Sequence, residues 1–185
     1  MIFNRLVVSV FVSLSVFVSL PTSLRAATAY QLDYDSREAL RHLYADNYKA
    51  AEIANQAAAA LVFPTIVKAG FIFGGQGGEG ALIKSGGAVG YYHTASFSYG
   101  LQAGVQKFGY VLFFMNHKAL SYLNKSDGWE IGVGPSIVIV DAGVARSMSS
   151  TTLQKDIYAF IFSQKGLMAG IGLQGTKITK FTPDQ

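Results

Sequence analysis

The 185-residue sequence predicts an α+β fold: an N-terminal amphipathic helix packed on a glycine-rich, mainly antiparallel sheet, sandwich or barrel-like, with one short inserted helix. Two observations predict this fold. Apolar residues recur every three or four positions before Pro64 and every second position after it. All 20 glycines lie between Gly70 and Gly175, so the earlier segment contains none. Because the two changes nearly coincide, a helical segment and a sheet segment should meet near residue 70.

The first 29 residues are expected to be a secretory signal peptide, which leaves 30–185 as a single domain. Arg5 supplies a short basic n-region, and residues 6–20 form an apolar stretch that is interrupted only by serines. Ala27-Thr28-Ala29 then offers a signal-peptidase cleavage site before Tyr30. The apolar stretch is shorter than the ~20 residues that span a bilayer, which disfavours a membrane anchor. We therefore expect an exported protein of the periplasm or beyond. Since the chain has no Cys, we expect no bacterial lipoprotein anchor.

The predicted helix begins near Asp35 or Ser36, either of which can cap a helix, and ends at Pro64. Residues three and four apart form its apolar face: Leu40, Leu43, Tyr44, Tyr48, Ala51, Ala54, Ala58 and Leu61. The opposite face carries three basic and three acidic side chains: Arg37, Glu38, Arg41, Asp46, Lys49 and Glu52. A balanced face is typical of a solvated surface, because a helix that binds anionic membrane by charge is more basic.

The glycine-rich part shows the alternation of β-strands. Residues 95–106 alternate strictly between bulky and small side chains. The segments 110–115, 137–140 and 157–162 are apolar on both faces and are predicted to be central strands. A short helix over 117–123, capped by Asn116, interrupts the sheet. Glycine weakens a strand unless another backbone approaches closely, so we expect the Ala-rich helix to pack on a Gly/Ser face that includes Gly100, Gly104, Gly132 and Gly134.

Motifs for catalysis, metals and nucleotides are weak or absent. The segments 75–80 and 170–175 match G-x-G-x-x-G, but neither is followed by a helix that could hold a pyrophosphate. The three histidines are far apart, there is no Cys, and no G-x-S-x-G elbow occurs. The net charge of +4 gives little support to nucleic-acid binding. We expect no enzyme activity, no cofactor, no metal, no nucleotide and no nucleic-acid partner.

The only tryptophan, Trp129, follows a turn at 125–128 and precedes a glycine-alternating strand. A tryptophan in this place either anchors the core beneath its turn or lies at a membrane interface or ligand rim. Both interpretations stay open, and Trp129 is therefore a candidate interface aromatic.

Eight short motifs in a fixed order resemble the SYLF family, which is related to the yeast actin-binding domain family. They lie at 60–70, 77–80, 90–96, 99–102, 126–130, 151–153, 165–170 and 177–179. The resemblance implies a non-enzymatic domain that binds lipid, with phosphoinositides as ligands of eukaryotic relatives. Some of those relatives bind actin, which is not expected of an exported bacterial chain. Their basic N-terminal segment corresponds here to the helix that bears Arg37, Arg41 and Lys49.

We therefore expect an exported lipid-binding domain that peripherally engages phospholipid headgroups, phosphoinositide-like and anionic, at the cell envelope. Candidate phosphate contacts are Arg37, Arg41, Lys49 and Lys68. Backbone N–H groups of a glycine-rich loop at 74–80 could add an anion-binding nest formed by Gly74, Gly75, Gly77 and Gly78. The alternative is an envelope scaffold that binds a protein partner. A small outer-membrane barrel is disfavoured, because a barrel lumen is polar and several predicted strands are apolar on both faces.

Overall fold

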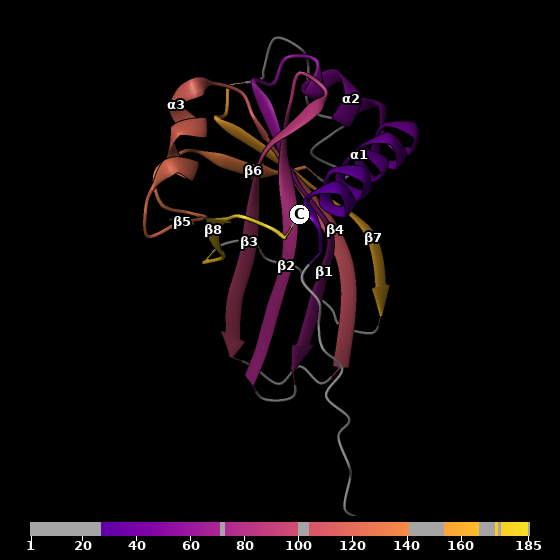
Figure 1. Cartoon of the computed structure of the whole chain (residues 1–185), viewed down its shortest axis with the longest axis vertical. Coiled ribbons are helices and arrows are strands. Elements are labelled where there is room, and N and C mark those ends of the chain that lie inside the picture. The colour runs from indigo at the N-terminus through magenta and orange to yellow at the C-terminus, as the bar shows by residue number, and fades with distance from the viewer. Residues whose placement is uncertain are drawn as a thin grey trace, which may run out of the picture.

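The structure, a computed structural model, describes residues 27–70, 73–99, 104–140, 154–166, 173 and 175–184. Its strands within these ranges are β1 (Ala59–Gly70), β2 (Phe73–Lys84), β3 (Gly87–Tyr99), β4 (Gly104–Phe114), β5 (Trp129–Glu130), β6 (Ile137–Ile139), β7 (Ile157–Gly166) and β8 (Lys177–Phe181). They form one sheet in the order β5-β8-β3-β2-β1-β4-β7-β6, in which only the β6–β7 pair is parallel. Figure 1 shows that β1 to β4 are long strands that extend well beyond the helices.

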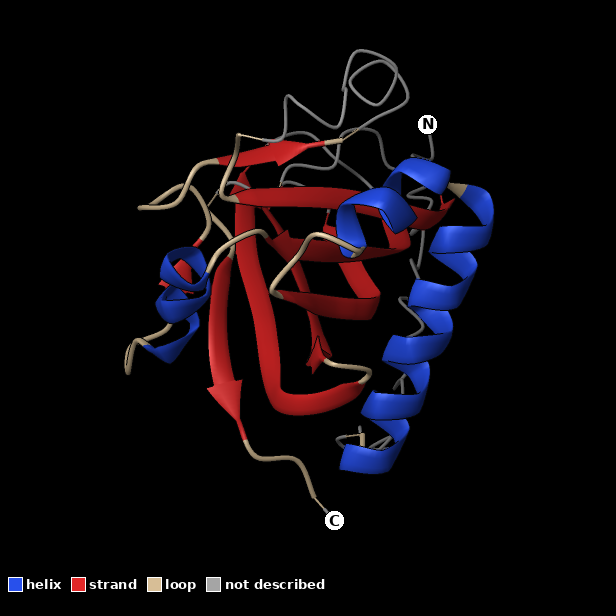
Figure 2. Cartoon of the chain, turned by 90° about the horizontal axis from the view of Figure 1, so that it is seen from above, coloured by secondary structure: helices blue, strands red, loops and turns tan. Residues whose placement is uncertain are grey.

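The helices lie on both sides of this curled sheet. Helices α1 (Ala29–Asp46) and α2 (Tyr48–Ala54) pack on one face, called here the outer face. The short α3 (His117–Leu120) and the 3₁₀ turn η1 (Ser121–Asn124) pack on the other, the inner face. Figure 2 shows the sheet curling between the two groups of helices. The predicted α+β class, mainly antiparallel sheet and short inserted helix are thus confirmed.

Both predicted boundaries of the N-terminal helix, its start near Asp35 or Ser36 and its end at Pro64, are wrong. The helix begins earlier, because the side chain of Thr28 caps it by accepting the N–H of Gln31 at 3.2 Å. It also breaks at Asn47, an extended residue whose side chain caps α2 by accepting the N–H groups of Lys49 and Ala50. Thr28 falls within the expected signal peptide, of which residues 1–26 lie outside the described part of the chain.

The alanine-rich segment after α2 belongs to the sheet. Strand β1 begins at Ala59, and its residues 61–63 are completely buried at the centre of the sheet. Burial on both faces outweighs the helical propensity of the alanines. Pro64 does not end a helix but lies inside β1, where the register shifts between Val62 and Thr65. Such a β-bulge is one of the few places in a sheet that tolerates the missing N–H of proline.

Each face of the sheet carries its own apolar core. The outer core, beneath α1 and α2, is formed by Leu40, Leu43, Ala50, Ile53, Ala60, Val62, Ala81, Ile83, Val111, Phe113, Val140, Tyr158 and Phe160. The inner core includes Leu61, Phe63, Phe108, Tyr110, Leu112, Phe114, Trp129 and Ile178. The two-faced burial of β4 and β7 agrees with their prediction as buried strands. The segment 137–140 differs, because β6 lies at an edge of the sheet.

The predicted packing of α1 on a Gly/Ser face is wrong. The helix packs instead on branched and aromatic side chains such as Val62, Ile83 and Phe113. Gly104 has open space beside it and Gly132 is exposed, while Gly100 lies outside the described residues. A glycine is needed rather at Gly80, where an added Cβ would collide with the Val62 carbonyl oxygen at the β1 bulge. The glycines of 75–80 lie in β2 and are followed by a turn into β3, so no dinucleotide-binding helix follows.

The carboxylate of Asp156 joins α3, β6 and β7. It accepts hydrogen bonds from Asn116 Nδ2 at 2.9 Å and from the N–H and hydroxyl of Ser136, both at 2.8 Å. Asn116 in turn caps α3, as predicted, by accepting the N–H of Ala119 at 2.8 Å. These hydrogen bonds hold the pKa of Asp156 below its ordinary value of 3.8, and the hydrogen bond from Asn116 has the largest effect.

Replacing Asp156 by Ala is expected to lower the free energy of unfolding by about 1–2 kcal/mol, because three charge-assisted hydrogen bonds are lost at a partly exposed site. The folded-state pKa is depressed, so this contribution is present above pH 3.8 and is lost as the pH falls through the folded-state pKa. Urea unfolding at neutral and acidic pH measures both effects. Asp46→Ala, at an exposed carboxylate, is the matched control. An equal loss in both variants would contradict the role of Asp156.

Candidate functional site

The predicted phosphate contacts on the N-terminal helices are already neutralised by their neighbours. Arg37 forms an ion pair with Asp33 at 2.6 Å, and Arg41 forms one with Glu38 at 2.7 Å. The hydrogen bond from Arg41 lowers the pKa of Glu38, so this pair persists across the neutral range. Lys49 is buried and pairs with Glu52 at 2.5 Å. These helices therefore present little uncompensated positive charge to an anionic surface.

Lys68 lies elsewhere, on the inner face of the sheet. Its side chain is 6% exposed, and its direct cross-strand neighbours are Gln76 on β2 and Gln106 on β4. The four predicted cations are therefore not brought together. Arg37 and Arg41 share the outer surface of α1, whereas Lys68 is enclosed on the opposite side of the sheet.

The glycine nest and the interface tryptophan are both contradicted. Residues 74–80 form no loop but the first part of β2, whose neighbours are β1 and β3, so successive N–H groups do not converge as a nest requires. Trp129 is 1% exposed, and its indole N–H donates to the Val133 carbonyl oxygen at 2.9 Å. Its ring contacts those of Phe114 and Tyr122. Trp129 is thus a core anchor beneath its turn.

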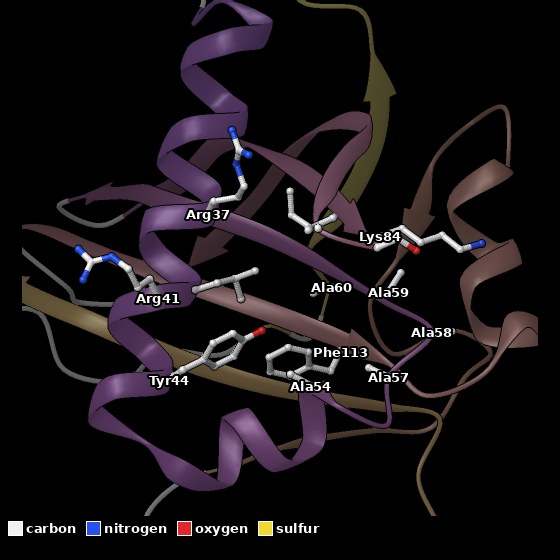
Figure 3. Close-up of a pocket in the computed structure, with 14 residues that line it drawn as sticks. Arg37, Arg41, Tyr44, Ala54, Ala57, Ala58, Ala59, Ala60, Lys84 and Phe113 are labelled. Carbon is white, nitrogen blue, oxygen red and sulfur yellow. The ribbon is translucent and has the colours of Figure 1, made fainter.

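A groove of about 410 Å³ lies between α1, the segment that joins α2 to β1, and the β2–β3 turn. Its apolar lining is Leu40, Ala54, Ala57, Ala58, Ala59, Ala60, Ile83 and Phe113. Figure 3 shows the ring of Tyr44 beside that of Phe113, while Arg41 and Lys84 extend away from the groove. Burial raises the pKa of Tyr44, so its phenol stays neutral. The groove can take up an apolar group, and its rim charges are directed to solvent.

A second surface lies where β1 to β4 extend beyond the helices (Figure 1). We call it the tip face and define it by the outer-face side chains of Val67, Phe73, Phe97, Val105, Lys107 and Lys165, all exposed. Phe97 is 94% exposed, Phe73 76% and Val105 58%. Large apolar side chains grouped at one end of a sheet mark an interaction site more often than scattered ones do.

The strand register arranges the tip face in rows. Phe97, Gly75, Ala69 and Val105 are successive cross-strand neighbours from β3 to β4, and they form an apolar row. The next row, two residues farther from the strand ends, contains Ala95, Gly77, Val67, Lys107 and Lys165. Two residues along a strand span about 6.6 Å. The tip face therefore has an apolar edge with cations set back from it by that distance.

The two lysines of this surface have no acidic partner in the part of the chain that the structure describes. Lys107 and Lys165 are directly opposite each other on β4 and β7. No carboxylate within the described ranges forms an ion pair with either of them. Directly opposed like charges destabilise a strand pair, so the arrangement favours an external anion.

Residues 95–183 match the model of the family described as Ysc84, Las17-binding protein actin regulator. This segment is therefore similar to the Ysc84 family. The resemblance to the SYLF family is thereby confirmed, and the match is to a family of binding proteins rather than of known enzymes. No curated protein matches the chain. The Ysc84 segment contains Phe97, Val105, Lys107 and Lys165, whereas the candidates Arg37, Arg41, Lys49 and Lys68 precede it.

Sequence reasoning missed the tip face because it assigned no role to the bulky face of 95–106. One signal could have identified that face as exposed: Val105 is followed, two residues on, by Lys107 on the same side of the strand. Among the described residues, no helix is long and apolar enough to span a bilayer, and no three acidic or histidine side chains gather as metal ligands would.

Proposed function

We propose that this domain binds anionic phospholipid membranes peripherally through the tip face, in the exported setting that the N-terminal sequence predicts. The observation that supports this proposal most strongly is the arrangement of the tip face in two rows. Phe97 and Val105 lie about 6.6 Å closer to the strand ends than Lys107 and Lys165 do. Interfacial proteins bury their apolar groups ~5–10 Å into the boundary between headgroups and acyl chains. When the apolar row reaches that depth, the two ammonium groups lie at the level of the phosphates.

The energies agree with reversible binding. Full burial of one phenylalanine side chain contributes about 1.5–3 kcal/mol. Each lysine near an anionic surface adds about 1 kcal/mol. The summed contributions of Phe97, Lys107 and Lys165 correspond to a membrane attachment that is reversible. Among the described residues, no helix is long and apolar enough to add a membrane span.

Co-sedimentation with vesicles tests this proposal. The chain from Ala27 onward should bind phosphatidylcholine vesicles that contain phosphatidylglycerol more tightly than phosphatidylcholine alone, and binding should weaken as salt is added. Val105→Asp should reduce the affinity by at least about tenfold, because a carboxylate then enters the apolar row. Val89→Asp is the matched control, since Val89 is 56% exposed outside the tip face. Equal effects of both variants, or no lipid dependence at low salt, would contradict the proposal.

A second candidate function, a scaffold that binds a protein partner, is favoured by the apolar groove beside α1. The arginines on its rim are already paired with acids of the same helix, which suits an apolar anchor better than a phosphate. A stoichiometric partner that is retained by the domain in the absence of any lipid would favour this function over membrane binding.

A further inference from the structure

We propose that a small depression on the tip face binds the phosphate monoester of a lipid headgroup. The depression, of about 160 Å³, is lined by Pro64, Thr65, Lys107, Phe108, Ser163 and Lys165. This inference rests on the proposed membrane binding and specifies which headgroup the tip face selects.

Two β-bulges, one on each of the strands β1 and β7 that flank β4, lie at the depression. On one side of β4, the register of β1 shifts between Phe63 and Ile66. On the other side, the register of β7 shifts opposite Lys107 and Gly109. The β1 bulge falls opposite Gly109 and the β7 bulge opposite Phe108, so the sheet is irregular on both sides of β4 at nearly the same level. Bulges are frequent next to functional sites, where they redirect side chains.

The backbone at the β7 bulge is also unusual. Ser163 has a φ of +53°, in the left-handed region that residues with a side chain rarely adopt. Strained residues of this kind persist where the surrounding structure holds them, and they gather at binding sites. The bulge places the exposed Ser163 among the residues that line the depression, together with the exposed Thr65. Hydroxyl groups of both residues are hydrogen-bond donors suited to phosphate oxygens.

The charge of the depression matches a monoester better than a diester. A phosphate monoester carries about −1.5 to −2 charges at neutral pH, whereas the phosphodiester of an ordinary phospholipid carries one. Lys107 and Lys165 supply two positive charges that no described carboxylate neutralises. The nearby carboxylate of Glu79, opposite Thr65 on β2, accepts the N–H of Ala27 at 3.2 Å and lies 3.6 Å from His93 Nδ1. It is therefore held by partners of its own.

Vesicles that differ only in the phosphate test the selection. Phosphatidylcholine vesicles with phosphatidic acid should bind the chain about tenfold more tightly than vesicles with phosphatidylglycerol at matched surface charge. Lys107→Gln/Lys165→Gln should lose this preference and bind both kinds of vesicle alike. The double variant should remain folded, with an unchanged or higher melting temperature, because it removes a like-charge pair. Lys84→Gln/Lys180→Gln, at exposed lysines outside the tip face, should retain the preference.

The outcomes separate this inference from the proposed function. Binding of both anionic vesicles without preference would overturn the monoester site and leave peripheral membrane binding intact. Binding to neither would overturn the proposed function. Titration with inorganic phosphate, followed by amide NMR shifts of Lys107, Ser163 and Lys165, then decides whether the depression takes a soluble phosphate. Shifts there without vesicle binding would overturn the lipid assignment, and no shifts would overturn the site itself.

Discussion

Replacing Trp129 by Ala is expected to lower the free energy of unfolding by about 3–5 kcal/mol. The side chain is 1% exposed and fills the space between the rings of Phe114 and Tyr122, whose centroids lie 5.9 and 6.4 Å from it. Truncation leaves a cavity in the inner core and removes the donor to the Val133 carbonyl oxygen. Strand β5 begins at this residue and pairs with Ile178 of β8, so that edge of the sheet should loosen as well.

Urea unfolding followed by far-UV circular dichroism measures this loss, since the variant contains no tryptophan to report by fluorescence. Trp129→Phe should be much milder, because the ring keeps most of the packing and only the indole donor disappears. Tyr48→Ala, at a ring that is 75% exposed on α2, controls for the loss of an aromatic without burial. A Trp129→Ala variant within 1 kcal/mol of the parent chain would restore the interface interpretation of this residue.

Replacing Phe73 and Phe97 together by Ser is expected to weaken binding to anionic vesicles by about a hundredfold or more. Each ring contributes about 1.5–3 kcal/mol when it leaves water, and a loss of 1.4 kcal/mol corresponds to tenfold. Both side chains are exposed in the described structure, so the fold should keep its stability. The loss should persist at high salt, because it removes apolar contact rather than charge.

Vesicle co-sedimentation over a range of ionic strength measures this effect. The matched control is Tyr48→Ser/Val89→Ser, which removes two exposed apolar side chains outside the tip face. If the control loses as much affinity as the Phe73/Phe97 variant, apolar contact is nonspecific and the tip face has no special role. If the loss vanishes at high salt, the rings act only indirectly, through the charged row.

Periodicity predicted the fold class well because it reports which residues are buried together. The two-faced apolar segments of β4 and β7 are direct consequences of the sheet. The single alternating strand predicted over 95–106 is wrong, because β3 ends at Tyr99 and β4 begins at Gly104. The helix boundaries could not be read in this way. The segment from Ala57 onward has helical composition, and only contact with β2 and β4 on both sides makes it a strand. The caps Thr28 and Asn47 could not be predicted either, because the sequence offers several other residues that can cap a helix, such as Asp35 and Ser36.

The site was less predictable than the fold, because basic residues in a sequence do not show whether they are paired. Arg37, Arg41 and Lys49 each find an acid three or four residues away on their own helices. Lys107 and Lys165 are 58 residues apart in the sequence and become neighbours only through the pairing of β4 with β7. The depression between them depends on two bulges, whose positions follow from register rather than from residue type.

The length of β2 sets a distance between the two ends of the domain. Phe73 belongs to the tip face and Lys84 borders the groove beside α1, and the eleven residue steps between them span about 36 Å. A domain that enters a bilayer with its tip would therefore stand upright and hold the groove roughly one membrane thickness above the lipid surface. In this orientation a protein bound in the groove is held at a fixed distance from the membrane, and its contact with the groove does not obstruct the contact of the tip face with lipid.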